Sequence, residues 1–456
     1  MARKKRTRFV CSHCGWETSN WLGSCGSCSR WNTLEEVAVA EESDNRVHKS
    51  RLNRREGEIR GPVGLDDIPV AETDRMLTGM NELDRVLGGG IMPGSFVLLG
   101  GDPGIGKSTL ALQCAEMMKD QKTLYVTGEE SLGQIRQRAG RLNVQTEMLR
   151  ILTETETMRV IETSRAEKPG ILIIDSIQTM YHSVLQSMPG TTAQIRESAA
   201  LLMQYAKQER VTVIAIGHVT KEGDLAGPRI LEHMVDTVLQ FEGDKQSHHR
   251  ILRSLKNRFG PAQEVGVFEM NASGLREVAN PSELFLSEYD AAVSGNAVVC
   301  SMEGTRPLLI EVQALVAPAA YGMPQRTASG FDQRRLSLLL AVLEKRCGWT
   351  FSQNDVFLNI AGGMKLSETA CDLGIAAALV SSISERAPGE PVVMIGEIGL
   401  GAEVRRVTQL ARRLEEAKNM GFRHAVVPQG STEQVEGIRI SSVGNMEAAF
   451  RKSGLN

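Results

Sequence analysis

Residues 101–108, GDPGIGKS, match the phosphate-binding pattern G-x-x-x-x-G-K-[ST] at every fixed position. The glycines let successive backbone N–H groups point at one anion, and a following helix would add its positive N-terminal end. Lys107 is expected to neutralise the β- and γ-phosphates of ATP, and the Ser108 hydroxyl to hold Mg²⁺. The predicted nucleotide-binding residues are Gly101, Asp102, Pro103, Gly104, Ile105, Gly106, Lys107, Ser108 and Thr109.

Further residues along the chain could complete such a site. Asp175 closes an apolar run, a position typical of the acid that binds Mg²⁺ through water in phosphate-loop enzymes. Glu129 or Glu130 is our candidate for orienting the attacking water. For one of these two glutamates, a role as a carboxylate at a helix N-terminus is the alternative. His218 lies where a γ-phosphate sensor could sit, although a lone histidine is often only structural.

The first 28 residues contain two C-x2-C pairs with ten residues between them, formed by Cys11, Cys14, Cys25 and Cys28. Four thiolates close the shell of one tetrahedral Zn²⁺ ion. So short a segment has no other visible core, and metal binding would supply its folding energy. The spacing therefore predicts a structural zinc site.

Aromatic and basic residues accompany these cysteines. Trp16, Trp21 and Trp31 lie beside the pairs, and five cationic residues stand between positions 3 and 8. Aromatic faces beside positive charge suit unpaired bases and phosphates. Tryptophans in a small domain also serve as its packing, and the sequence leaves both interpretations open.

The elements that must position the phosphate loop follow from apolar runs. Residues 95–99, 123–127, 171–176 and 211–218 are predicted strands, and 80–87, 109–115 and 192–209 are predicted helices. This alternation predicts a parallel sheet with helices on both faces. Ligands of such sheets bind at the carboxyl ends of the strands, where Glu129, Asp175 and His218 would gather.

Composition sets the limits of these expectations. A chain of 456 residues suggests about three units, and a formal net charge of −3 gives no global argument for nucleic acid. No apolar run indicates a signal peptide or a membrane span, and the scattered cysteines outside the two pairs suggest a reducing compartment, so we expect a cytoplasmic protein. From residue 35 to about 60, acidic and then basic residues predict a flexible linker.

These motifs, together with VTGEES at 126–131, IIDSIQTM at 173–180, GHVTKEG at 217–223 and KNRFG at 256–260, closely resemble the bacterial RadA (Sms) family of RecA-like ATPases. The resemblance covers essentially the whole chain, and KNRFG is its most specific part. It implies a homo-hexameric ring with ATP at subunit boundaries and a role in DNA repair and recombination. The partners it implies are single-stranded and branched DNA, RecA, and a replicative helicase or another repair factor.

The two cations of KNRFG are compatible with such a role. Lys256 and Arg258 stand at i and i+2 on an extended segment, so both can point at one anion. That anion could be a γ-phosphate in the neighbouring subunit or a DNA phosphate. A solvated turn is the alternative, and the following FGP sequence weakens it.

The last part of the chain is similar to the proteolytic domain of Lon protease at residues 357–365 and 395–401. This resemblance implies an α+β, ribosomal S5 domain 2-like fold. Lon cleaves with a Ser-Lys dyad, but Ala370 or Cys371 stands at the nucleophile position and residues 408–411 offer no lysine. A peptidase needs an activated nucleophile, so we expect an inactive domain that serves as an assembly platform.

The expected fold class is α/β: a RecA-like P-loop core with an N-terminal four-cysteine zinc finger and a C-terminal α+β Lon-protease-like domain. The predicted boundaries are 1–34 for the finger, 35–64 for the linker, 65–278 for the ATPase and 279–456 for the Lon-like domain. The expected function is a DNA-dependent ATPase that drives branch migration and stimulates RecA-mediated strand exchange in a cytoplasmic, nucleoid-associated setting. The predicted catalytic residues are Lys107, Glu129, Glu130, Asp175, Lys256 and Arg258, with ATP, Mg²⁺ (at Ser108 and Asp175) and Zn²⁺ as cofactors.

Three alternatives remain at this point: a KaiC-like regulatory ATPase without motor activity, an ATP-dependent protease, and a passive zinc-finger DNA-binding module. The zinc finger and KNRFG argue against the first. The missing dyad argues against the second. The third predicts that Lys107→Ala would leave function intact.

Overall fold

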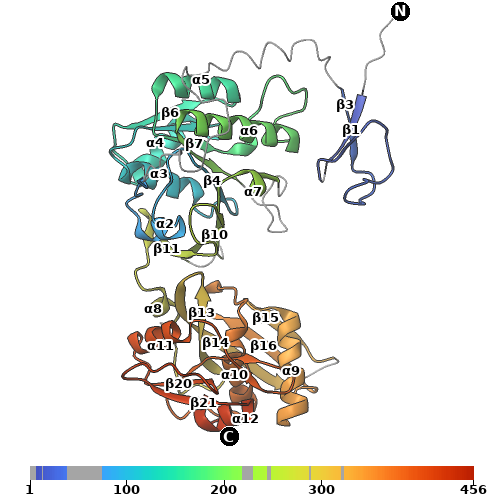
Figure 1. The fold of residues 1–456 in the computed structure, drawn as a ribbon, viewed down its shortest axis with the longest axis vertical. Coiled ribbons are helices and arrows are strands. Elements are labelled where there is room, and N and C mark those ends of the chain that lie inside the picture. The colour runs from blue at the N-terminus through green and yellow to red at the C-terminus, as the bar shows by residue number, and fades with distance from the viewer. Residues whose placement is uncertain are drawn as a thin grey trace, which may run out of the picture. The chain divides into compact units, whose positions relative to one another are not determined.

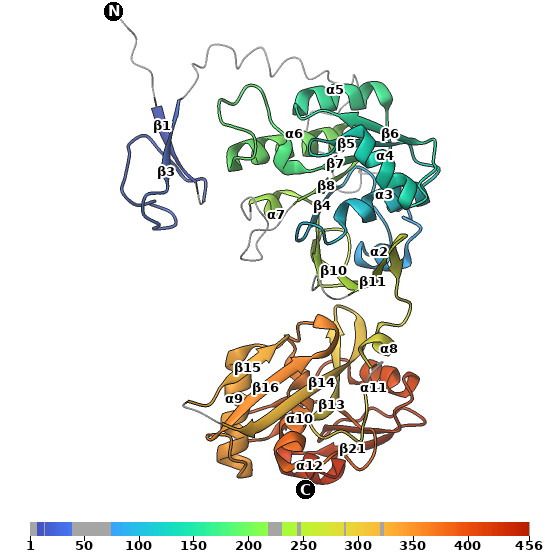
Figure 2. The ribbon, with the colours of Figure 1, turned by 180° about the vertical axis from the view of Figure 1, so that it is seen from behind.

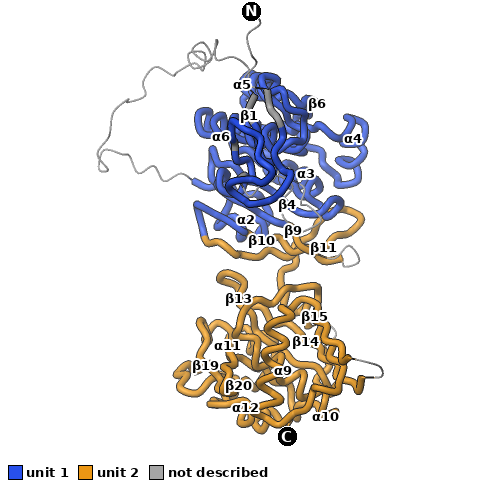
Figure 3. The backbone as a smooth tube through the Cα atoms, turned by 90° about the vertical axis from the view of Figure 1, so that its right-hand side faces the viewer, with its two compact units in different colours: residues 1–240, 255–260 blue, residues 241–254, 261–456 orange. Residues whose placement is uncertain are grey.

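The computed structural model describes residues 7–12, 14–38, 74–217, 230–243, 248–286, 289–319 and 323–455. The chain forms two compact units, one of residues 1–240 and 255–260 and the other of residues 241–254 and 261–456 (Figure 3). The predicted boundary between residues 278 and 279 stays a prediction. His218 and most of the predicted linker lie outside the described residues.

The N-terminal segment is a small antiparallel sheet in the strand order β2-β1-β3. Its strands are β1 (Thr7–Cys11), β2 (Glu17–Thr18) and β3 (Leu34–Ala38). Residues 35–38, which the sequence assigned to the linker, belong to β3, where Thr7 pairs with Ala38 and Cys11 with Leu34. Backbone pairing with β1 holds this acidic segment in a strand, which its charged composition did not indicate.

The core of the first unit is a parallel sheet in the order β9-β4-β8-β7-β5-β6. The strands are β4 (Phe96–Gly100), β5 (Thr123–Thr127), β6 (Leu149–Thr153), β7 (Ile171–Asp175), β8 (Thr212–Ile216) and β9 (Thr237–Glu242). Strands β4, β5, β7 and β8 are buried along their whole length, as expected for a parallel sheet covered on both faces. The predicted α/β class is confirmed.

Helices cover both faces of this sheet because side chains alternate along each strand. Phe96 and Leu98 of β4 pack with α5 and α6, whereas Val97 and Leu99 face α2 and α3. The helices of this unit, labelled in Figures 1 and 2, are α2 (Asn81–Val86), α3 (Lys107–Met117), α4 (Leu132–Arg141), α5 (Thr157–Glu167), α6 (Thr192–Glu209) and α7 (Ile230–Met234), with the 3-10 turn η2 at Ile177–Thr179. The helix predicted at residues 192–209 is α6 with both ends unchanged.

The second unit contains an antiparallel group of β10 (His249–Asn257), β11 (Val265–Asn271) and β12 (Gly274–Glu277), the end of β10 belonging to the first unit. Its main sheet is mixed, in the order β15-β16-β14-β13-β17-β20-β21. These strands are β13 (Asn296–Glu303), β14 (Arg306–Pro318), β15 (Arg326–Ser329), β16 (Asn354–Ile360), β17 (Val393–Met394), β20 (His424–Pro428) and β21 (Arg439–Val443). The small pair β18 (Glu397–Ile398) and β19 (Val404–Arg405) stands apart.

Helices on both faces complete this α+β unit. Buried residues of α9 and α10 pack on one face of the main sheet, and those of α11 pack on the other. The helices are α8 (Pro281–Phe285), α9 (Gln333–Cys347), α10 (Asp372–Ser384), α11 (Leu410–Asn419) and α12 (Met446–Ser453), with 3-10 turns η3 (Ala361–Gly363) and η4 (Thr369–Cys371). Among the described residues, no helix is both long and apolar enough to cross a membrane.

Candidate nucleotide-binding site and zinc ribbon

The predicted phosphate loop connects β4 to α3. Its three glycines have positive φ angles of 145° at Gly101, 81° at Gly104 and 122° at Gly106, which side chains rarely adopt. Space for a Cβ atom is open at Gly104, so φ is the constraint there. Helix α3 begins at Lys107 and has no side-chain cap at Gly106, so its first N–H groups face the loop. Thr109 lies in the first turn of this helix.

Lys107 is held inside this loop. Its Nζ atom donates hydrogen bonds to the carbonyl oxygens of Gly101 at 2.7 Å and Asp102 at 2.9 Å, and the residue is only 4% exposed. Burial lowers the pKa of this ammonium, and the carboxylates of Asp175, Asp102 and Glu129 partly offset the effect. A buried cation bound by neutral carbonyls is arranged to receive an anionic ligand.

Asp175 lies at the carboxyl end of β7, in register with Thr127 of β5 and Ile216 of β8. The sheet therefore places the ends of these strands at the same edge as the phosphate loop. The Tyr125 hydroxyl donates a hydrogen bond to Asp175 Oδ2. Burial, followed by the Asp175 charge, raises the pKa of this phenol, so Tyr125 remains a donor. Sequence reasoning missed Tyr125, because its pairing depends on two strands that are distant in sequence.

The two candidate glutamates have different surroundings. Glu129 accepts a hydrogen bond from the Ser176 hydroxyl, and its charge acts on Lys107. Glu130 forms an ion pair with Arg138 of α4, eight residues further on. Ser131 caps α4 through a reciprocal capping box with Gln134, which fixes the turn between strand and helix. Glu129 is therefore the glutamate that faces the phosphate loop.

The KNRFG segment lies at the opposite edge of the sheet. Lys256 Nζ donates to the carbonyls of Glu232 at 2.7 Å, His233 at 3.0 Å and Val235 at 2.8 Å. Arg258 Nη2 reaches the same His233 carbonyl at 3.4 Å. Burial and the neighbouring Arg258 charge lower the pKa of Lys256. The structure thus brings the two cations together on one acceptor.

A carboxylate missed by sequence reasoning anchors this edge. Asp236 is 3% exposed, and its Oδ2 accepts the backbone N–H of Phe96, the first residue of β4, at 3.1 Å. Its Oδ1 pairs with Arg258 Nη1 at 3.4 Å. The phosphate loop follows the other end of β4. At ~3.3 Å per strand residue, Arg258 and the loop are separated by about 13 Å of strand.

The four cysteines gather as predicted. Their Sγ atoms all lie within 4.8 Å of one another, with Cys14 and Cys25 at 3.4 Å and Cys11 and Cys28 at 3.8 Å. Tetrahedral Zn²⁺ with Zn–S bonds of ~2.3 Å sets sulfur atoms about 3.8 Å apart, so the cluster fits this ion. Both knuckles turn alike: the Gly15 N–H donates to the Cys11 carbonyl and the Ser29 N–H to the Cys25 carbonyl, each at 2.9 Å.

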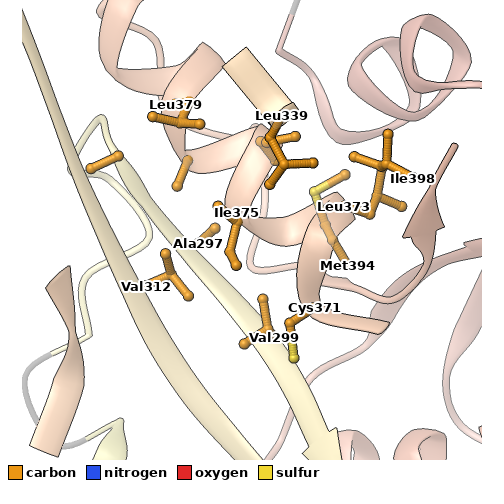
Figure 4. Packing of buried hydrophobic residues seen from close by; sticks show 14 of the residues in the cluster. Ala297, Val299, Val312, Leu339, Cys371, Leu373, Ile375, Leu379, Met394 and Ile398 are labelled. Carbon is orange, nitrogen blue, oxygen red and sulfur yellow. The ribbon is translucent and has the colours of Figure 1, made fainter. Parts of the chain in front are cut away.

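The positions that correspond to the Lon dyad carry no activated nucleophile in the described structure. Cys371 is fully buried beside Val299 in an apolar cluster, and burial raises the pKa of its thiol well above the ordinary value (Figure 4). Arg413 instead connects the two dyad segments. This fully buried side chain forms an ion pair with Glu368 and donates to the carbonyls of Cys300 at 2.6 Å and Thr408 at 3.0 Å.

Three family models match this chain. Residues 62–224 match the AAA domain, residues 9–36 the rubredoxin metal binding domain, and residues 315–431 the subunit ChlI of Mg-chelatase. Together with the parallel sheet, the phosphate loop and the four-cysteine cluster, they define a RecA-like P-loop protein with an N-terminal zinc ribbon and a C-terminal Lon-like domain.

The relatives identify the family within this class. DNA repair protein RadA of Brucella abortus is 48% identical over 440 residues, covering 94% of this chain and 93% of its own length. DNA repair protein RadA of Escherichia coli is 45% identical over 455 residues, covering 99% of both. A crystal structure of the RadB recombinase covers 44% of this chain and 100% of its own, with 24% identity and a TM-score of 0.37. The chain belongs to the RadA family of DNA repair proteins.

Proposed function

We propose that this protein is a DNA-dependent ATPase that drives branch migration of recombination intermediates and stimulates RecA-mediated strand exchange. The observation that carries the proposal is the gathering of Lys107, Asp175 and Glu129 at one edge of the parallel sheet beside the phosphate loop. Membership of the RadA family supports DNA as the substrate, because its relatives are DNA repair proteins. It also argues against a regulatory ATPase of the KaiC type.

The residues of the loop fit a bound nucleotide. Lys107 would exchange its two carbonyl acceptors for phosphate oxygens, and the N–H groups at the start of α3 would bind the same phosphates. Ser108 and Asp175 would hold Mg²⁺, with Tyr125 fixing the Asp175 carboxylate. MgATP supplies the bond that is hydrolysed and the charge that these residues stabilise. Glu129 would orient the water, with Ser176 holding its carboxylate in place.

Lys256 and Arg258 would complete the site of a neighbouring subunit. They lie at the opposite end of β4 from the loop of their own chain, so they cannot serve the nucleotide that this loop binds. In a homo-hexameric ring, one subunit's KNRFG edge would face the next subunit's phosphate loop. A phosphate of the neighbouring subunit's nucleotide would replace the carbonyl acceptors of Lys256 and Arg258 in and after α7. Binding and release of that nucleotide would therefore change the position of α7.

The remaining partners follow from the same proposal. Single-stranded and branched DNA are the substrates, RecA is the recombinase partner, and a replicative helicase or another repair factor is a further candidate.

The zinc ribbon would bind Zn²⁺ through Cys11, Cys14, Cys25 and Cys28. Such a protein would act in the cytoplasm at the nucleoid. The Lon-like unit would be an assembly platform without peptidase activity, so purified protein should not degrade casein in the presence of ATP.

Extension of a joint molecule made by RecA tests the motor proposal. Purified protein with ATP and Mg²⁺ should extend the heteroduplex, whereas Lys107→Ala and Lys256→Ala should bind DNA without extending it. Lys119→Ala is the matched control, because its side chain is 69% exposed two residues after the end of α3. No extension by wild-type protein that hydrolyses ATP would overturn the motor proposal and favour a regulatory ATPase.

A further inference from the structure

The KNRFG segment is attached to the rest of its unit on the side opposite its two cations. Side chains alternate along an extended segment, so Asn257 points away from Lys256 and Arg258. The Asn257 Nδ2 atom donates a hydrogen bond to the carbonyl oxygen of Leu87, the residue that caps the C-terminal end of α2, at 3.0 Å. Its Oδ1 atom accepts the backbone N–H of Phe259 at 3.0 Å. One amide side chain therefore closes the turn and attaches it to the end of α2.

Arg75 joins the same two backbone segments. Its Nη1 atom donates to the carbonyl oxygens of Leu87 and Gly90, each at 3.1 Å, and its Nη2 atom donates to the carbonyl oxygen of Phe259. All three acceptors are neutral backbone groups, so this guanidinium serves here to hold backbone segments together. The Leu87 carbonyl thus receives hydrogen bonds from both Arg75 and Asn257.

Glycines let the two segments meet backbone to backbone. A Cβ atom at Gly260 would lie 3.1 Å from Gly88 Cα and 3.1 Å from Asn257 Nδ2, so a side chain at position 260 would crowd both atoms. Gly90 has a φ angle of 114°, and a Cβ atom there would lie 3.3 Å from the Cβ atom of Arg75. Both sides of the contact therefore depend on a glycine.

The backbone that carries the cations leaves its strand at this point. Strand β10 ends at Asn257, so Arg258 and Phe259 lie beyond it. The Arg258 N–H donates to the Asp236 carbonyl at 3.1 Å. The N–H and the carbonyl of Phe259 are both bound by side chains, those of Asn257 and Arg75. The course of the turn after β10 therefore depends on these two side chains.

Cations that act on a phosphoryl group need a fixed backbone beneath them. A displacement of about 1 Å in such a group can lower a rate ~10²-fold. We propose that Arg75 and Asn257 are positioning residues, which hold the two cations of the KNRFG segment where they reach the nucleotide of a neighbouring subunit. This inference rests on the proposed function and adds two residues through which the cations act. Neither of the two is expected to contact the nucleotide itself.

Mixed assemblies of full-length variants separate a positioning role from general damage to the fold. Asn257→Ala protein keeps its own phosphate loop but would present poorly placed cations to its neighbour, so its DNA-stimulated ATP turnover should fall about 10- to 100-fold. Lys107→Met protein has the opposite defect, with an intact KNRFG segment and an impaired loop. A mixture of the two should recover activity to the level reached by mixing Lys107→Met with Lys256→Ala. A fold damaged by Asn257→Ala would not be restored by such a partner.

Further variants show which contacts position the cations. Arg75→Ala should behave like Asn257→Ala in the mixture, and Arg75→Lys should remain impaired, because a single ammonium cannot bridge the two segments as the guanidinium fork does. Asn257→Asp keeps the acceptor for the Phe259 N–H but loses the donor to Leu87, so its turnover should lie between Asn257→Ala and wild type. Lys119→Ala, whose side chain is 69% exposed, is the control and should retain wild-type turnover.

Affinity for a fluorescent ATP analogue with Mg²⁺ checks that the phosphate loop of each variant is intact. Asn257→Ala should bind the analogue no more weakly than Lys256→Ala does. Weaker binding than in Lys256→Ala would place the effect of Asn257 at its own loop and overturn the positioning role.

The two mixtures separate this inference from the function on which it rests. Recovery in the Lys256→Ala mixture without recovery in the Asn257→Ala mixture would overturn the positioning role alone. Wild-type turnover in both Asn257→Ala and Arg75→Ala would also overturn it. Recovery in neither mixture, in assemblies shown to contain both chains, would overturn the action of Lys256 on a neighbour and this inference with it.

Discussion

Two buried cations, one in each compact unit, differ in what neutralises them. Lys107 is 4% exposed and is held by two neutral carbonyls of the phosphate loop. Arg413 is fully buried and is paired with the Glu368 carboxylate of its own unit. Carboxylates near Lys107 act on it only through their charge, and its hydrogen-bond acceptors are carbonyls, whereas Arg413 forms a direct ion pair with a carboxylate.

This difference distinguishes a cation placed to bind a ligand from a cation whose partner is part of the fold. Removing a charge from water is costly, and an internal partner offsets that cost permanently. In the Lon-like unit the buried Arg413 guanidinium has such a partner in the Glu368 carboxylate. In the ATPase unit the desolvation cost of Lys107 is not fully offset until a ligand binds. Neutralising this charge therefore increases ligand affinity instead of stability.

Lys107→Met should have the largest effect on activity. Removing the cation that neutralises the phosphates should lower ATP turnover by about 10³-fold or more. Stability should not fall, because an apolar chain of similar length replaces a buried charge. Phosphate release and chemical unfolding measure the two effects, with Lys119→Met as control. Near-normal turnover would contradict the assigned role of Lys107.

Arg413→Met should lower stability and leave ATP turnover largely unchanged, the reverse of Lys107→Met. It leaves Glu368 without its cation, and breaking a buried pair costs about 3–5 kcal/mol of unfolding free energy. Adding Glu368→Gln should recover part of this loss, since no unpaired charge remains. Denaturant unfolding of the second unit measures both variants. A double variant less stable than Arg413→Met would show that the pair is not the relevant interaction.

Glu129→Gln should lower turnover about 10²-fold while nucleotide binding is retained, because an amide cannot accept a proton from water. Glu130→Gln is the matched control in the same turn. It weakens only the partly exposed pair with Arg138, which contributes less than about 1 kcal/mol. ATP turnover and nucleotide affinity are measured in both variants. A larger loss of turnover in Glu130→Gln than in Glu129→Gln would assign the water-orienting role to Glu130.

The smallest expected effect concerns pH. Burial lowers the pKa of Lys107 below the ordinary 10.5. As pH rises through this lowered value, the free protein loses the ammonium, and affinity for the nucleotide should fall. Nucleotide titrations between pH 7 and 10 should show a steeper decline for wild type than for Lys107→Met; parallel curves would argue against a titrating Lys107.

Local spacing was enough to predict the phosphate loop, the four cysteines and helix α6. Each depends on residues that are close in sequence, where motif chemistry and periodicity apply directly. The partners of these groups were not predictable in the same way. Tyr125 reaches Asp175, and Asp236 reaches Arg258 and Phe96, only because strand order brings distant residues together.

One wrong prediction, one missed ion pair and one choice left open have the same physical origin. Residues 35–38 have a composition typical of a linker, yet pairing with β1 makes them a strand. The Arg413–Glu368 pair could not be recognised from the charges alone, because most arginines in the described part of the chain are not buried and only packing shows that Arg413 is. Our proposed preference for Glu129 over Glu130 likewise rests on the Arg138 contact, which the sequence did not indicate.

We propose that Lys256 and Arg258 act on the nucleotide of a neighbouring subunit, since they lie at the far edge of their own sheet. Mixing Lys107→Met protein with Lys256→Ala protein tests it most directly. Each variant alone should be inactive in DNA-stimulated ATP hydrolysis. In mixed assemblies, the intact Lys256 of one chain can face the intact loop of the other, and activity should return to a fraction of the wild-type rate. No recovery over a range of mixing ratios, in assemblies shown to contain both chains, would contradict the account.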